Sequence, residues 1–162
     1  VGDGAEGVLA VEMGATVRDL AEWTVRMIER KETGVYYANS VPKTFTMKEV
    51  LDECKAVSQS DASFTWASEE FLLQNEVVPW SEMPLWLPEE AAPHLKGFMF
   101  VSSDKAVRAG LSFRSLTDTI GATLNWYQTD RRKLKAGLEP DKEEALLRKL
   151  RETRSNDLET TK

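Results

Sequence analysis

The sequence holds few residues that could carry general acid–base or nucleophilic chemistry. Its one histidine, His94, would have to serve alone in a Ser-His-Asp or Cys-His arrangement. Its one cysteine, Cys54, falls on the apolar side of an expected helix, where buried and inert thiols are common. A metal cluster would lack nitrogen and sulfur ligands. We therefore interpret His94 as a solvated surface residue and assign no catalytic or metal-binding residue.

Paired acids and an early glycine cluster favour equally plain interpretations. Neighbouring carboxylates on a helix point about a hundred degrees apart, so we expect solvated groups and not a paired acid and base. These pairs are Glu69 with Glu70, Glu89 with Glu90, and Glu143 with Glu144. The cluster "GDGAEG" at 2–7 lacks the preceding strand and following helix of a dinucleotide loop. We expect a turn there and assign no cofactor-binding residue.

Two tryptophans in a proline-rich stretch are the better candidates for ligand contact. Residues 77–97 hold four of the six prolines together with Trp80 and Trp86. Aromatic side chains in irregular loops commonly line small-molecule pockets, and core packing or a subunit contact is the alternative. We name Trp80 and Trp86 as candidate substrate-binding residues, with packing left open.

Composition limits the class of protein. The chain has 162 residues and a net charge of −6, with Lys and Arg scattered among Asp and Glu, so we expect no nucleic-acid partner. No apolar run approaches the roughly 18 residues that span a bilayer, and the first residues do not resemble a signal peptide. We expect one compact, reduced domain in the cytoplasm, without membrane contact.

Helical periodicity and capping residues predict most of the elements. Apolar residues from Val17 to Ile28 recur at helical spacing, which predicts one buried face. Further helices are expected over 46–57, 69–75, 104–110, 116–128 and 140–154. The candidate N-caps are Thr16 with Asp19, Thr46 with Glu49, Ser68, Ser103, and Ser115 with Asp118.

Short strands and irregular segments complete this interpretation. Strands are predicted over 8–11, 34–40, 64–67 and 97–101. Residues 77–97 are expected to form an irregular connection. We interpret 1–15 as a loop or altered strand remnant, 16–154 as a single lobe, and 155–162 as a disordered tail.

The stretch "DKAVRAGLSFRSLTDTIGATLNWY" at 104–127 resembles the C-terminal signature of the extended short-chain dehydrogenases/reductases, the NAD-dependent epimerase/dehydratase family. That signature has an Asp-x-x-Lys-Ala helix, a Gly-Leu turn, a Phe-Arg segment and a helix ending Thr-Leu-x-Trp-Tyr. The residues that carry the resemblance here are Asp104, Lys105, Ala106, Gly110, Leu111, Phe113, Arg114, Thr123, Leu124, Trp126 and Tyr127, with Asp104 directly before Lys105. Three earlier stretches also occur in the order of the family, namely "VRDLAEW", "GVYYANS" and "TFTMKEVLDEC". The resemblance is strongest to the bacterial reductase-like members.

The resemblance implies an α/β fold, here as an α+β fragment. It would comprise the C-terminal substrate-binding lobe and the last strand and helix elements of a Rossmann-type domain. The implied cofactor is NAD or NADP in the intact enzyme, with none expected for this chain alone. A guanidinium at Arg114 could meet an anionic or carbonyl substrate, and an ion pair with a nearby acid is the alternative. Arg114 therefore joins the candidate substrate-binding residues.

Departures from the family pattern concern the catalytic parts. The family binds its cofactor through Gly-x-x-Gly-x-x-Gly and acts through Tyr-x-x-x-Lys, and neither motif occurs here. The stretch "VEMGAT" replaces the usual aromatic and β-branched strand before the first long helix, which a junction or truncation near Met13 would explain. We expect the isolated chain to be inactive.

The sequence thus favours the substrate-side lobe of an NAD(P)-dependent epimerase, dehydratase or reductase. The expected partners are a small-molecule substrate, a nucleotide-binding half in cis or in trans, and a second copy in a homo-oligomer. The alternative is a non-catalytic module that binds a small molecule or another protein. The strand at 34–39 would belong to a missing parallel sheet, so we expect it to be unpaired in this chain alone. A stable monomer would favour a module, and aggregation or obligate dimerisation would favour a fragment.

Overall fold

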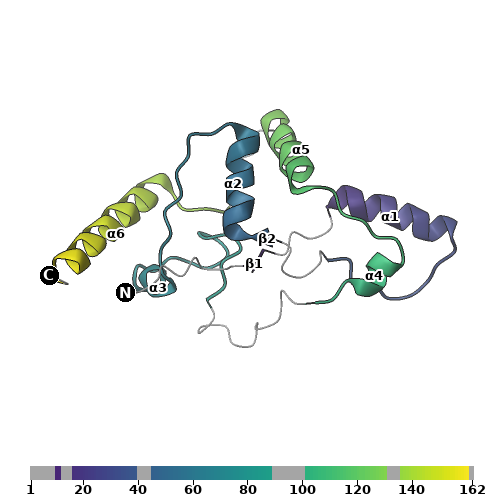
Figure 1. Ribbon diagram of the computed structural model, residues 1–162, viewed down its shortest axis with the longest axis horizontal. Coiled ribbons are helices and arrows are strands. Elements are labelled where there is room, and N and C mark those ends of the chain that lie inside the picture. Colours follow the sequence, from purple (N-terminus) through teal and green to yellow (C-terminus); the bar gives the residue numbers. More distant parts are fainter. Residues whose placement is uncertain (1–9, 12–15, 40–44, 89–100, 131–135, 161–162) are drawn as a thin grey trace. The chain divides into compact units, whose positions relative to one another are not determined.

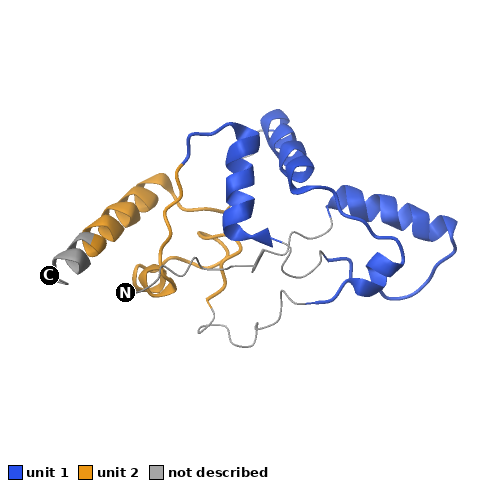
Figure 2. Cartoon of the chain, in the orientation of Figure 1, with its two compact units in different colours: residues 1–62, 95–132 blue, residues 63–94, 133–162 orange. Residues whose placement is uncertain are grey.

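The computed structural model describes residues 10–11, 16–39, 45–88, 101–130 and 136–160 (Figure 1). Within these residues the chain is mostly helical, and one antiparallel pair of two-residue strands is present. The chain divides into two compact units (Figure 2), where the sequence predicts a single lobe over 16–154. Unit 1 comprises Val1–Ala62 and Leu95–Arg132, and unit 2 comprises Ser63–His94 and Lys133–Lys162. The helix-rich part of the expected fold is confirmed.

Unit 1 holds four helices and the strand pair. Its helices are α1 (Val17–Glu29), α2 (Met47–Ser58), α4 (Asp104–Arg108) and α5 (Leu116–Thr129). Strand β1 (Ala10–Val11) pairs antiparallel with β2 (Phe45–Thr46), so that Ala10 lies opposite Thr46. Unit 2 holds α3 (Glu69–Gln74) and α6 (Pro140–Thr160). The sequence predicts a disordered tail from residue 155, whereas helix α6 extends to Thr160.

Local capping chemistry explains where the helices begin. The capping boxes of Thr16 with Asp19 and of Thr46 with Glu49 are both complete, since each Thr hydroxyl accepts the N3 backbone N–H and each acid accepts from the cap residue. Ser68 and Ser115 also cap α3 and α5 as predicted. These bonds satisfy backbone donors that a helix start would otherwise leave open.

The predicted cap of α4 is confirmed in its position but makes no side-chain capping bond. Ser103 is the N-cap residue of α4, although its hydroxyl does not accept a backbone N–H of the first turn. The neighbouring Ser102 hydroxyl accepts the Asp104 backbone N–H at 3.2 Å. Ser103 is 1% exposed, so this cap residue is packed into the interior of unit 1.

The predicted strands at 34–40 and 64–67 are wrong for the described residues. Residues 35–39 and 64–67 have no strand assignment, and no backbone–backbone hydrogen bond between described residues involves 35–39. Strand-forming side chains are not sufficient, because a strand needs a neighbouring ladder. Part of the strand at 8–11 is confirmed as β1, and residues 8–9, 40 and 97–100 lie outside the described residues.

The core of unit 1 joins α1 to α4. Trp23 and Met27 of α1 pack with Ala106 and Leu111, and all four are at most 8% exposed. The Trp23 indole N–H donates to the Ala109 carbonyl at 3.2 Å, and its ring meets the Tyr36 ring edge-on at a centroid distance of 5.4 Å. These contacts hold the chain before and after α4 against α1.

The one buried face that the sequence predicts for α1 is present, and it covers only part of the apolar residues. Trp23 and Met27 are buried, whereas Val17 is 86% exposed, Val25 is 55% exposed and Ile28 is 71% exposed. On a 3.6-residue helix all these positions belong to one broad apolar face. Unit 1 covers the side of that face that carries Trp23 and Met27, and the side that carries Ile28 is open.

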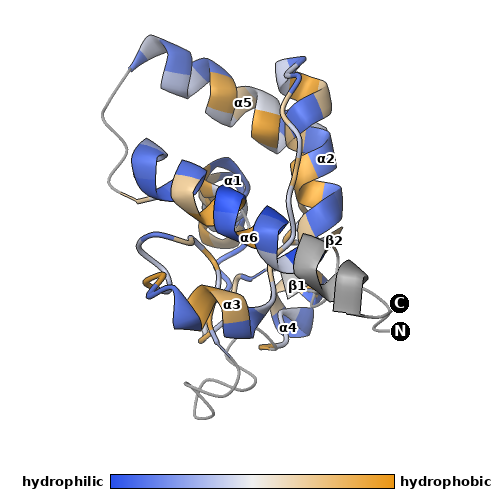
Figure 3. Cartoon of the chain, turned by 90° about the vertical axis from the view of Figure 1, so that its left-hand side faces the viewer, coloured by the Kyte–Doolittle hydropathy of each residue, from blue (hydrophilic) through white to orange (hydrophobic). Residues whose placement is uncertain are grey.

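Helices α2 and α5 pack against one another. The Thr117 hydroxyl donates to Glu53 at 2.5 Å, and a Cβ at Gly121 would lie 3.9 Å from Val57. Neither helix contains a buried residue, although both carry apolar segments (Figure 3). At the end of α5, Trp126 is 56% exposed and Tyr127 is 40% exposed. The two helices thus cover each other only in part.

Unit 2 has a separate small core. Leu72 of α3 packs with Val77 and Trp86, and Leu146 of α6 is among the half-buried residues around them. Outside this core, the Leu73 side chain is 41% exposed and the Trp66 side chain is 37% exposed. In the part of the chain that the structure describes, no helix combines the length and apolarity that a membrane crossing requires.

Candidate functional site

The Trp80 loop, defined here as residues 77–88, contains two tryptophans that differ in burial. Trp86 is 8% exposed and lies in the unit 2 core, whereas Trp80 is 50% exposed. For Trp86 the packing alternative is therefore confirmed. Trp80 keeps an open indole face that could contact a ligand or a partner.

The backbone of this loop is held in an unusual conformation. Trp80 and Leu85 have φ values of +66° and +67°, in the left-handed region that bulky residues rarely adopt. Both side chains are exposed, and neither position is a glycine that would tolerate this φ without cost. Such conformations persist only where the surroundings fix them.

Hydrogen bonds close the loop around Glu82. The Trp80 N–H donates to the Met83 carbonyl at 3.2 Å, and the Glu82 N–H donates to the Val78 carbonyl at 3.0 Å. The Glu82 carboxylate in turn accepts the Val78 N–H at 2.8 Å. Outside the loop, the Gly137 N–H donates to the Ser81 carbonyl at 2.7 Å.

Lys142 of α6 is the charged partner of this loop. Its ammonium lies 2.6 and 2.8 Å from the two Glu82 oxygens and also donates to the Glu76 carbonyl at 3.1 Å. The hydrogen bonds from Lys142 and from the Val78 N–H lower the pKa of Glu82, against the opposing effect of its partial burial. Glu82 is therefore ionised at neutral pH, and Lys142 is already paired.

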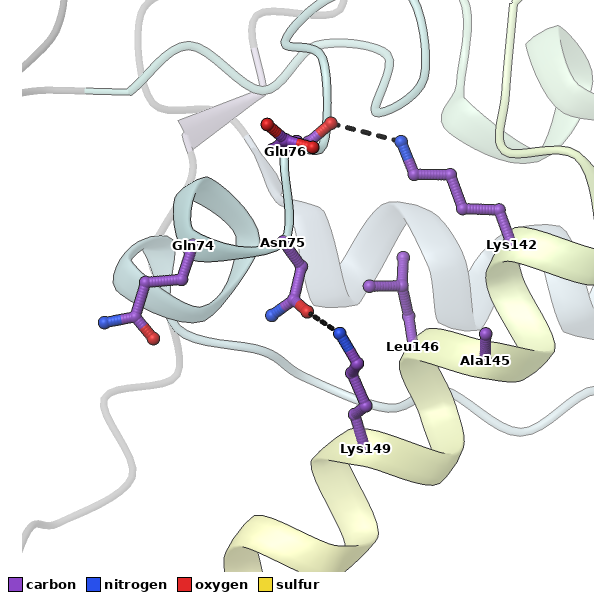
Figure 4. Close-up of a pocket in the computed structure, with 7 residues that line it drawn as sticks. All are labelled: Gln74, Asn75, Glu76, Lys142, Ala145, Leu146 and Lys149. Carbon is purple, nitrogen blue, oxygen red and sulfur yellow. Dashed lines mark hydrogen bonds between the residues drawn. The ribbon is translucent and has the colours of Figure 1, made fainter.

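A shallow cavity of about 220 Å³ lies between α3 and α6 (Figure 4). The residues that line it are Gln74, Asn75, Glu76, Lys142, Ala145, Leu146 and Lys149. Lys149 donates to the Asn75 side-chain carbonyl at 2.8 Å, and Lys142 is neutralised by Glu82. The sequence does not predict this cavity, because its lining comes from segments more than 60 residues apart.

Arg114 forms ion pairs within unit 1. Its Nη1 lies 2.5 Å from Asp19 Oδ1, and its Nη2 bonds Glu22. The alternative of an ion pair with a nearby acid is thus confirmed, and a substrate contact by Arg114 stays a prediction. Arg114 belongs to unit 1, and both tryptophans belong to unit 2.

Asp19 is a buried carboxylate held in its charged form. Burial alone would raise its pKa, but hydrogen bonds from the Thr16 hydroxyl and backbone N–H, with the Arg114 guanidinium, lower it instead. Arg114 in turn has a raised pKa, chiefly through its hydrogen bond to Glu22. A carboxylate with this many partners is suited to a structural role and not to proton transfer at neutral pH.

The remaining candidates give no catalytic arrangement among the described residues. Cys54 is half-buried, and burial followed by the nearby charge of Glu53 raises the pKa of its thiol, so it is poorly suited to nucleophilic attack. No group of three metal-ligating side chains occurs in the described part of the chain. His94, Glu89, Glu90 and residues 2–7 lie outside it.

Comparisons of the chain with models of protein families, with curated proteins and with solved structures found no match.

Proposed function

We propose that this chain is the substrate-side lobe of an extended NAD(P)-dependent epimerase, dehydratase or reductase. The order of elements over 104–127 supports the proposal. Helix α4 is followed by a turn at Gly110, whose φ is +92°, then by the Phe113–Arg114 segment and by the capped helix α5. Each element lies at the residues that carry the resemblance to that family.

The incomplete burial of unit 1 is the observation that carries the proposal. Helices α2 and α5 contain no buried residue, and the side of the apolar face of α1 that carries Val17, Val25 and Ile28 is exposed. Soluble domains cover such faces with another layer of secondary structure. Several apolar faces left open on one small unit favour a lobe that packs against a further domain.

Residues 35–39 support the same conclusion. Val35 and Tyr37 are 83% and 64% exposed, whereas Tyr36 and Ala38 are half-buried against the core of unit 1. This alternation is the period of a strand, and the backbone lacks a ladder within the described residues. The segment is suited to the edge of a sheet that another domain would supply.

In such an enzyme the nicotinamide cofactor carries the hydride, and the protein positions the substrate. We assign the second task to this lobe. Trp80, with its exposed indole, is the proposed contact for an apolar part of the substrate. Arg114 fixes α1 to the segment before α5 and so acts on the frame of the lobe.

Cofactor binding tests this function directly. The experiment is a fluorescence titration of NADH and of NADPH against the native polypeptide that carries these residues, and against the 162-residue chain alone. We expect binding by the native polypeptide and none by the isolated chain. Failure of the native polypeptide to bind either nucleotide would favour the alternative of a non-catalytic binding module.

A matched pair of substitutions on α1 tests the open face. Ile28→Lys places a charge on the exposed side of the apolar face, and Glu29→Lys places the same side chain on the neighbouring exposed polar position. In the native polypeptide, Ile28→Lys should cost about 2 kcal/mol, the value of burying one Ile side chain, and Glu29→Lys should cost little. In the isolated chain neither should matter. Equal effects in the native polypeptide would contradict the docking of this face.

A further inference from the structure

The Trp80 loop is bonded to helix α6, because Lys142 of α6 contacts Glu82 of the loop across 60 residues of sequence. Trp80 and Leu85 both hold a left-handed φ with large, exposed side chains. Neither side chain gains core packing that would compensate for its backbone conformation. Hydrogen bonds and charges are therefore the interactions that fix the conformation. Trp80 bonds Met83 through the backbone, and the side-chain bonds of the loop meet at Glu82.

Glu82 links the loop to α6. Inside the loop its carboxylate accepts the Val78 N–H at 2.8 Å and so closes the turn that contains Trp80. From outside the loop, Lys142 bonds both carboxylate oxygens. The Glu82 side chain is only 24% exposed, and the Lys142 side chain is 34% exposed. Partial burial strengthens such a pair relative to one in open solvent.

Lys142 also reaches the residue at which the chain leaves α3. Its ammonium donates to the carbonyl of Glu76, a further non-glycine residue with positive φ, +53° (Figure 4). One ammonium thus holds the entry to the Trp80 loop and the carboxylate at its centre. Lys149, about two turns further along the same face of α6, donates to Asn75. Within the described residues it forms no hydrogen bond or ion pair with 77–88, which makes it a matched control.

We infer that Lys142 is a positioning residue, which acts through Glu82 to hold residues 77–88 in the conformation that presents the Trp80 indole to solvent. The inference concerns the conformation of the loop and rests on the proposed function only for the ligand that Trp80 would meet. Trp86, anchored in the core, fixes the far end of the same loop.

Backbone amide exchange measured by NMR tests this inference on the full chain. In Lys142→Met the exchange of the Val78, Trp80 and Glu82 amides should accelerate about fivefold or more, the change expected for loss of a contact worth one hydrogen bond. The Trp80 indole N–H resonance, assigned with Trp80→Phe, should shift at the same time. Lys142→Arg should restore both signals, because it keeps the charge.

The controls separate positioning from general stability. Lys149→Met should leave the three loop amides and the indole resonance unchanged, although it removes a bond from the same helix. The inference is overturned if Lys142→Met leaves the loop unchanged. It is also overturned if the Leu72 amide, which bonds Ser68 within α3, accelerates by the same factor. No cofactor or substrate enters this measurement, so its outcome is independent of the proposed activity.

Discussion

Arg114 Nη1 lies 2.5 Å from Asp19 Oδ1 and thereby joins the segment before α5 to the first turn of α1. The same carboxylate accepts the backbone N–H and the hydroxyl of Thr16 through its other oxygen. Asp19 is thus both the N3 residue of the capping box, where Thr16 is the cap, and the partner of a distant guanidinium. The start of α1 and the path of residues 111–115 are fixed by one side chain.

Neutralising Asp19 should therefore destabilise unit 1 more than neutralising Glu22. Asp19 is 6% exposed, whereas the Glu22 side chain is 54% exposed and solvated. We expect Asp19→Asn to lower the urea midpoint clearly and Glu22→Gln to change it little, because exposed ion pairs contribute weakly. Thr16→Ala, which removes the cap alone, should cost about 1 kcal/mol. A larger effect of Glu22→Gln than of Asp19→Asn would contradict this account.

Acid should weaken the fold through these capping boxes. Hydrogen bonds from Thr16 lower the pKa of Asp19 against its burial, and those from Thr46 lower the pKa of Glu49. A lowered folded-state pKa stabilises the fold above the unfolded value of about 4, and this contribution is lost as the pH falls through the folded value. The urea midpoint should therefore fall as the pH is lowered from neutral to below about 4. The decline should be shallower in Asp19→Asn combined with Glu49→Gln.

The two loop tryptophans should differ in their contribution to stability. Trp86→Ala leaves a cavity beside Leu72 and Val77 and should cost about 3–5 kcal/mol. Trp80→Ala removes a half-exposed ring and should cost less than about 1 kcal/mol. Thermal unfolding of the two variants measures the difference. Similar losses for both would mean that Trp80 is also a packing residue.

Glycine substitutions offer a second matched comparison. Gly34 and Gly137 have φ values of +138° and +117°, so alanine is strained at either position. A Cβ at Gly34 would also lie 3.3 Å from the Tyr36 ring and 3.4 Å from Lys105 Nζ, whereas a Cβ at Gly137 meets nothing within 4 Å. We expect Gly137→Ala to cost about 1 kcal/mol and Gly34→Ala to cost more. Equal losses would show that φ alone decides the cost.

The sequence predicted what depends on a few adjacent residues. The caps at Thr16, Thr46 and Ser115 lie within four residues of their partners, so spacing alone identifies them. Spacing also places Ser103 correctly at the N-cap of α4, but it does not predict that the Ser103 side chain is buried and makes no capping bond.

Features that depend on distant partners could not be predicted in this way. The strand expected over 34–40 needs a ladder, and side-chain propensity says nothing of whether a ladder exists. The pairing of Arg114 with Asp19 spans 95 positions, and that of Lys142 with Glu82 spans 60. Likewise, periodicity could not divide the apolar residues of α1 between a covered and an open side of one face. The sequence identified Trp80 and Trp86 together, and only packing separates them.

The interrupted course of unit 2 affects how it can form during synthesis. Its core residues Leu72, Val77 and Trp86 are synthesised before residues 95–132, and Leu146 is synthesised only afterwards. At about 5–20 residues per second, several seconds separate the synthesis of Trp86 from that of Leu146. During that interval the core of unit 2 lacks its contact with α6, so we expect the half-formed unit to present apolar side chains that chaperones bind.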